Sequence, residues 1–187
     1  MKLKEDNIQV LYGERDGIPI EKGVILNESF LEENAAQIQG FLEFCTAYPD
    51  LFLDLIRPES ESMTLFFYQR IVLRAAMRFK NIFITACRAF SKSFTMILSM
   101  VLQCIFMPGT KRFICAPGKG QSAQIAKEKL IEIFRTWPLL KKEVVGWELN
   151  DPPGNYGKDY VTLKFRNGSQ FDVVAPLDST RGGRRHG

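Results

Sequence analysis

The sequence predicts an α/β fold, in which strands and helices alternate along the chain. Short apolar runs rich in β-branched residues occupy residues 81–87 and 111–116, and segments of helical length follow them at 93–106 and 121–137. This order indicates a parallel sheet, in which ligands bind at the carboxyl ends of the strands. We therefore expect two buried parallel strands, each followed by a helix that packs on the sheet.

A β-hairpin near the C-terminus supports the same class. Residues 160–165 and 170–174 alternate in polarity, and the connection between them contains Asn167 followed by Gly168. An Asn-Gly pair between two β-rich runs is a strong hairpin signal, because both residues tolerate the positive φ angles of a tight turn.

The chain before residue 63 is expected to form a separate portion. Residues 1–26 predict an irregular arm in which short strands can form. A helical pattern starts at residues 27–29 and ends before Pro49, and a second short apolar piece covers 51–56. Residues 1–62 carry 5 basic and 13 acidic side chains, whereas residues 63–187 carry 20 basic and 8 acidic ones. The basic domain of residues 63–187 suits a polyanionic partner, although a basic surface that is simply soluble is the plainer alternative.

Composition excludes several classes of protein. The chain has 187 residues, of which 45% are hydrophobic and 25% charged, as in a soluble globular domain. We expect a cytosolic protein, because residues 1–6 lead into no apolar signal segment and the apolar stretch 94–107 is too short to cross a bilayer. The four cysteines form no C-x-x-C pair and are expected to be buried, reduced thiols, and the single histidine supports no histidine-based metal site.

Residues 65–80 predict an amphipathic helix just before the first strand. Its start carries Phe67, Tyr68 and Gln69. An aromatic ring there can stack on adenine, and a Gln amide can read the adenine edge, since it offers both a donor and an acceptor. A solvated Gln beside a core aromatic is the alternative. The expected buried side chains of this helix are Leu65, Ile71, Val72, Ala75, Ala76 and Met77.

Residues 86–93, ACRAFSKS, connect the first strand to its helix and end in Lys92 and Ser93. In a phosphate-binding loop, N–H groups at a helix start converge on the anion, a Lys reaches the β- and γ-phosphates and a hydroxyl holds Mg²⁺. Ala86 and Ser91 occupy the positions where that motif has glycines, so Ser91 is expected to adopt a strained backbone or to shift the loop. A Ser-Lys-Ser helix start is also compatible with an ordinary N-cap.

Further cations follow the second strand and the hairpin. Lys119 lies three positions after residues 111–116, at the expected carboxyl end of a strand, and the last seven residues contain three arginines and three glycines. These groups can contact phosphates, whereas a disordered basic end is the alternative for the last seven residues. The candidates for contact with nucleic acid or phosphate are Lys119, Arg181, Arg184 and Arg185.

Taken together, residues 63–187 resemble the N-terminal ATPase domain of the large terminase subunit of tailed bacteriophages, the motor that packages viral DNA. The resemblance rests on an ordered set of segments: 67–69, 87–93, 115–117 with Gln121 beyond, the hairpin and 179–182. It implies a P-loop NTPase-like parallel sheet flanked by helices, incomplete here, with a β-hairpin and a helical N-terminal portion.

The resemblance also implies the ligands and the role of each residue. The ligands are ATP and Mg²⁺, with Tyr68 and Gln69 at the adenine, Lys92 at the phosphates and the Ser93 hydroxyl on Mg²⁺. The early arginine, Arg88, touches the γ-phosphate or couples the nucleotide state to movement, so Arg88 and Lys92 are the catalytic candidates. The implied nucleotide-binding residues are Tyr68, Gln69, Ala86, Cys87, Arg88, Ala89, Phe90, Ser91, Lys92 and Ser93.

The family's partners are duplex DNA, the small terminase subunit and the portal protein, and the resemblance implies a homo-oligomeric ring in the cytoplasm of a host bacterium. The family also has an acidic pair on a strand after its Arg-Gly element, and a nuclease domain after that. Neither follows Arg181 here, and Asp172 and Asp178 do not fit the pair. We therefore expect the front part of a longer protein, which alone hydrolyses ATP weakly or not at all.

Two other functions share these features. A helicase-like nucleic-acid ATPase has the same three elements: the Gln, the phosphate loop and the Ala-Pro pair of residues 116 and 117. A truncated ATP-binding or assembly module that does not hydrolyse ATP would also explain Ser91 and the missing acidic pair.

Overall fold

The computed structural model describes residues 8–15, 18–26, 28–61, 63–115, 121–145, 155–156 and 160–174. The chain divides into two compact units, Met1–Phe44 and Cys45–Gly187. The division falls earlier than the 62/63 boundary expected from composition, because the helix α3 (Pro49–Leu55) packs on α4 (Phe67–Arg78) within the second unit.

The first unit contains a regular hairpin where the sequence predicted an irregular arm. The strands β1 (Ile8–Arg15) and β2 (Ile18–Leu26) pair antiparallel, with a register shift between Leu11 and Tyr12. The helix α1 (Glu28–Glu33) and the greater part of α2 (Ala35–Ala47) follow. The predicted helical segment is therefore divided at Asn34, whose side chain donates a hydrogen bond to the Phe30 carbonyl.

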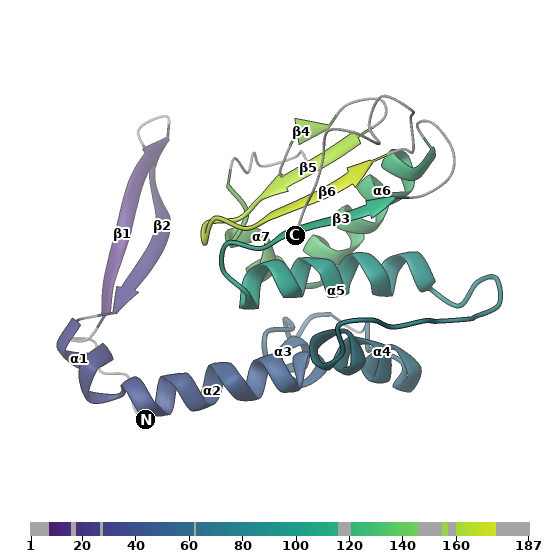
Figure 1. Ribbon diagram of the computed structural model, residues 1–187. Helices are drawn as coiled ribbons and strands as arrows, with labels where there is room; N and C mark the ends of the chain where they lie inside the picture. The colour runs from purple at the N-terminus through teal and green to yellow at the C-terminus, as the bar shows by residue number, and fades with distance from the viewer. Residues whose placement is uncertain are drawn as a thin grey trace. The chain divides into compact units, whose positions relative to one another are not determined.

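The second unit combines a small sheet with helices, as Figure 1 shows, so it is broadly α/β. After α4 come α5 (Lys92–Phe106), β3 (Lys111–Cys115), α6 (Gln121–Thr136) and α7 (Pro138–Lys142). The strands β4 (Asn155–Tyr156), β5 (Tyr160–Lys164) and β6 (Gln170–Val174) complete the described elements. Both α5 and α6 contact the sheet, and α4 contacts α5.

The sheet is mixed, whereas the sequence predicted a parallel one. Its order is β3-β6-β5-β4, and among the described strands only β3 and β6 run parallel. The predicted hairpin is confirmed, and its turn, with Gly168 at φ +81°, makes β5 antiparallel to β6. Asn167 in this turn donates to the carbonyls of Cys104 and Ile105 at 2.7 and 3.0 Å, which ties the hairpin to the end of α5.

The prediction of a first strand at residues 81–87 is wrong. No strand forms there, and the side chains of Ile82, Phe83 and Ile84 are 41%, 93% and 37% exposed. β-Branched composition favours a strand only where a partner edge and a packing surface exist, and none of the described strands pairs with this segment. The loop that leads into α5 therefore follows an exposed extended segment and does not follow a buried strand.

The second strand exists but is less buried than predicted. In β3 the exposed and half-buried residues alternate, and Phe113 is 47% exposed, because β3 lies at the end of the described sheet. The predicted buried face of α4 is also only partly right. Leu65 before the helix is buried, but Ile71 is 52% exposed and Leu73 takes the core position on the helix.

The core lies between α5, α6 and the hairpin strands. Leu98, Val101 and Leu102 of α5 pack with Leu130 and Ile133 of α6, and all five are fully buried. Trp137, which follows α6, is also buried, and its Nε1 donates to the Leu53 carbonyl at 3.0 Å. This bond holds α3 against the core.

All four cysteines are unpaired, as expected, but only two are buried. Cys45 and Cys104 lie inside, and burial raises the pKa of the Cys104 thiol to about 12. Cys87 and Cys115 are exposed because the segments that carry them lie outside the core. Within the described ranges, no helix has the length and apolar character that crossing a membrane requires.

Candidate phosphate-binding site

The loop before α5 has a left-handed backbone at two residues that are not glycine. Ala89 has φ +63°, and Ser91 has φ +49° and ψ 28°. The strain expected at Ser91 is confirmed, and the second strained position is Ala89, three residues after the position of the missing first glycine. An L-residue in this region costs roughly 1–2 kcal/mol, and such strain concentrates at functional sites.

The first turn of α5 has no ordinary N-cap, which was the alternative interpretation of the Ser-Lys-Ser sequence. The Ser91 side chain makes no capping hydrogen bond, and its backbone is left-handed where a capping residue is extended. The Ser91 carbonyl instead accepts hydrogen bonds from the N–H and the hydroxyl of Thr95, both at 3.0 Å. The N–H groups at the start of α5 are therefore not satisfied by Ser91, which is the condition for binding an anion there.

Lys92 folds back over its own loop. Its Nζ donates to the Ala86 carbonyl at 2.9 Å and also to the Cys87 carbonyl. The exposed ammonium thus lies beside the loop backbone at the first residue of α5, where a bound anion could draw it away from two neutral acceptors.

A cavity of about 830 Å³ opens over this loop. Its volume is within the range of small-molecule sites, which is roughly 300–1,000 Å³. Three groups of residues form the lining: the loop and first turn of α5, the segment before α4 together with Gln69, and one side of α6. The lining residues are Arg88, Ala89, Phe90, Ser91, Lys92, Ser93 and Phe94, then Met63, Thr64, Phe66 and Gln69, and finally Ile125, Lys129 and Glu132.

Gln69 lies at this cavity and has a second role in α4. It is only 2% exposed, and its Oε1 accepts the Phe66 N–H at 2.9 Å, which satisfies a backbone donor at the helix start. Its amide nitrogen makes no hydrogen bond to any other described residue. This nitrogen can therefore donate to an acceptor on a ligand, such as N1 of adenine, which in guanine carries a hydrogen.

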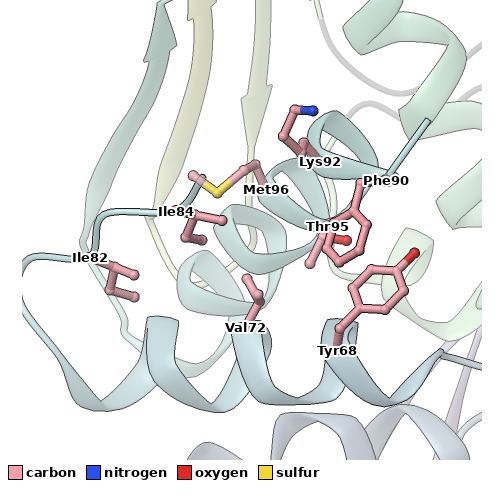
Figure 2. Close-up of a pocket in the computed structure, with 8 residues that line it drawn as sticks. All are labelled: Tyr68, Val72, Ile82, Ile84, Phe90, Lys92, Thr95 and Met96. Carbon is pink, nitrogen blue, oxygen red and sulfur yellow. The ribbon is translucent and has the colours of Figure 1, made fainter. Parts of the chain in front are cut away.

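Tyr68 lies at a neighbouring pocket of about 250 Å³, which Figure 2 shows. Its ring already stacks on Phe90, with centroids 3.9 Å apart, and on Phe66 at 5.7 Å. The structure therefore separates Tyr68 from Gln69, which the sequence had assigned to one adenine contact. At the larger cavity the aromatic rings are those of Phe66, Phe90 and Phe94, of which Phe66 is 63% exposed and Phe94 is buried.

The structure brings together seven of the ten residues expected to bind nucleotide, namely Gln69 and the loop from Arg88 to Ser93. Ala86 and Cys87 contribute only the carbonyls that Lys92 holds. Lys119, Arg181, Arg184 and Arg185 lie outside the described residues. Sequence reasoning missed Phe66, Lys129 and Glu132; the spacing 125, 129, 132 on a predicted helix was the signal for the last two.

The residues at the cavity fit Mg²⁺ only when phosphate is also bound. Mg²⁺ prefers oxygen ligands and usually combines one or two protein oxygens with waters and substrate phosphates. Ser93 supplies a hydroxyl and Glu132 a carboxylate, and the described residues contain no cluster of three or more metal-binding His, Cys, Asp or Glu side chains. No family model and no curated protein matches this chain.

Replacing Ser91 by glycine is expected to raise the free energy of unfolding by about 0.5–1 kcal/mol. Relief of the left-handed strain exceeds the extra backbone entropy that glycine loses on folding. Ser93→Gly is the matched control, because Ser93 is helical and glycine there should lower the stability. Urea denaturation of the three proteins measures both effects. A destabilised Ser91→Gly protein would mean that the Ser91 side chain has an essential contact.

Proposed function

We propose that the cavity over the loop of residues 88–93 binds ATP, and that this chain is the ATP-binding part of a DNA-packaging motor of the terminase type. The observation that carries the proposal is the helix start at Lys92, which lacks a side-chain cap and opens into a cavity lined by the loop cations. The terminase assignment, with duplex DNA, the small subunit and the portal as partners, rests on the ordered sequence motifs. The proposed P-loop fold and the proposed ring-shaped assembly rest on the same motifs.

In this proposal the phosphates lie at the first turn of α5. The backbone N–H groups there and the Lys92 ammonium bind them, and Arg88 neutralises the outermost charge. Mg²⁺, which neutralises phosphate charge when bound, would be held by the Ser93 hydroxyl. The base lies toward Phe66 and Phe90, where it can stack, and Gln69 donates to its edge.

Binding is expected to exceed turnover in this chain. Phosphoryl transfer to water requires a group that orients the attacking water. Glu132 is the one carboxylate that lines the described cavity, and it is ion-paired to Lys129 at 2.7 Å. This pairing favours the non-hydrolysing ATP-binding module as the second candidate function.

Equilibrium binding of a fluorescent ATP analogue tests the proposal directly. The wild-type protein should bind it, and unlabelled ATP and tripolyphosphate should compete, whereas adenosine should compete much less. A protein that binds none of these ligands would contradict the nucleotide site. If adenosine competes and tripolyphosphate does not, contacts with the base provide the affinity and the loop does not bind phosphate.

The contribution of Gln69 is measured by base selectivity. Gln69→Glu keeps an oxygen for the Phe66 N–H but removes the amide donor, so the preference for ATP over GTP should fall by about 3–10-fold, the value of one hydrogen bond. The ratio of the two affinities is the measurement, since any effect of the new charge on the phosphates cancels in it. An unchanged ratio would show that Gln69 serves only to start α4.

A further inference from the structure

One side of α6 faces the same cavity and carries a pair of opposite charges. Ile125, Lys129 and Glu132 all line it, at the spacing that places residues on one side of a helix. The Lys129 Nζ lies 2.7 Å from a Glu132 carboxylate oxygen. Both side chains are about one-third exposed, so solvent and ligands can reach the pair.

The loop adds two further cations to this lining. Arg88 and Lys92 both line the cavity, so the described lining has three cations and one carboxylate. Lys92 is engaged with the carbonyls of Ala86 and Cys87 and stabilises its own loop. Lys129 therefore differs from Lys92, because its partner is an anion on the same helix.

We propose that Lys129 is a second cation for the outermost phosphates, and that Glu132 holds it in the absence of ligand. The proposal rests on the proposed function and adds a specificity element to it. A polyphosphate entering between the loop and α6 takes Lys129 from Glu132, and Glu132 then opposes the ligand by like-charge repulsion. The pair thus favours ligands with more phosphates, since a longer anion bound at the first turn of α5 extends further toward α6.

Breaking the Lys129–Glu132 ion pair on ligand binding costs the protein little free energy. A partly exposed ion pair between residues three apart on a helix contributes little to stability, because water screens it and both side chains lose freedom. A ligand carrying several charges attracts the ammonium more strongly than one carboxylate does. Loss of the Lys129–Glu132 contact on binding is therefore favourable when the phosphate chain is long.

The test compares variants of the two α6 residues with three anionic probes: ATP, ADP and inorganic tripolyphosphate. Lys129→Gln should weaken ATP and tripolyphosphate about 5–10-fold and ADP less than 3-fold. Glu132→Gln should tighten ATP and tripolyphosphate about 2–5-fold. Lys142→Gln on α7 is the matched control, since Lys142 does not line the cavity, and it should change none of the affinities. Circular dichroism and the thermal midpoint check that each variant is folded.

The outcomes separate this proposal from the nucleotide site itself. If Lys92→Ala weakens ATP but Lys129→Gln and Glu132→Gln both bind like wild type, the α6 proposal is wrong and the loop site stands. If Lys129→Gln weakens tripolyphosphate while Lys92→Ala does not, the cavity binds anions through α6 and the loop assignment is wrong. If both α6 variants weaken anion binding, the Lys129–Glu132 pair supports the structure of the site, and the proposed repulsion between Glu132 and the ligand is wrong. Absence of anion binding by wild type would reject both.

Discussion

Replacing Lys92 by alanine is expected to weaken ATP binding about 10–100-fold. A hydrogen bond from an ammonium to phosphate contributes about 1.5–3 kcal/mol, and each 1.4 kcal/mol is a factor of ten in affinity. The change also removes the two bonds to the carbonyls of Ala86 and Cys87, which hold the loop in its strained conformation. Competition with the fluorescent ATP analogue measures the effect, and adenosine should bind both proteins alike.

Lys111→Ala is the control for lost positive charge, because Lys111 is an exposed residue of β3 that does not line the cavity. Its ATP affinity should stay within about twofold of wild type, since exposed charges at a distance are largely screened by salt. Equal binding of ATP by the wild-type and Lys92→Ala proteins would reject the phosphate-loop assignment. Failure of both to bind would reject it as well.

Replacing Asp50 by alanine is expected to lower the free energy of unfolding by about 2–3 kcal/mol. The Asp50 side chain is fully buried and receives hydrogen bonds from Arg74 at 2.7 Å, through Nε and Nη2, and from Arg70 at 3.3 Å. Breaking a buried pair costs about 3–5 kcal/mol. The expected loss is smaller here, because Arg70 keeps Asp54 and the side chain of Arg74 is 37% exposed.

Asp54→Ala is the matched control for this cluster between α3 and α4. Asp54 bonds the same Arg70, at 2.6 and 3.1 Å, but its side chain is 34% exposed. Exposed pairs contribute about 1 kcal/mol or less, so this variant should lose far less stability than Asp50→Ala. Urea denaturation of both gives the comparison. Equal losses would show that burial does not distinguish the two carboxylates.

The same cluster predicts sensitivity to acid. Burial alone would raise the pKa of Asp50, but the hydrogen bonds and charge of Arg74, together with Arg70, outweigh it and lower the pKa from its ordinary value of 3.8. The unfolded chain therefore takes up this proton more readily than the folded one. The stability contributed by Asp50 is complete above about pH 5 and is lost as the pH falls through the ordinary and then the lowered pKa. Asp50→Asn should lack this part of the acid dependence.

Local patterns alone predicted much of the second unit. The helices α4, α5 and α6, the strand β3 and the hairpin of β5 and β6 lie within a few residues of their predicted bounds, because periodicity and turn residues such as Asn167 and Gly168 act over short distances. The strain at Ser91 was also predictable, since a helix entry of this type requires a left-handed residue and no glycine is present.

The exposed segment 81–87, the mixed sheet and the composition of the cavity wall depended on long-range contacts. Whether an apolar run becomes a strand depends on a partner edge that the run does not encode, and Ile82 and Ile84 find none among the described strands. Likewise, Tyr68 stacks on Phe90 and lines the smaller pocket, whereas Phe66 lines the larger cavity. The helix α6 contributes Lys129 and Glu132 to the lining of that larger cavity. Residues far apart in the chain meet only when the helices pack, so local pattern located the loop and tertiary packing chose its neighbours.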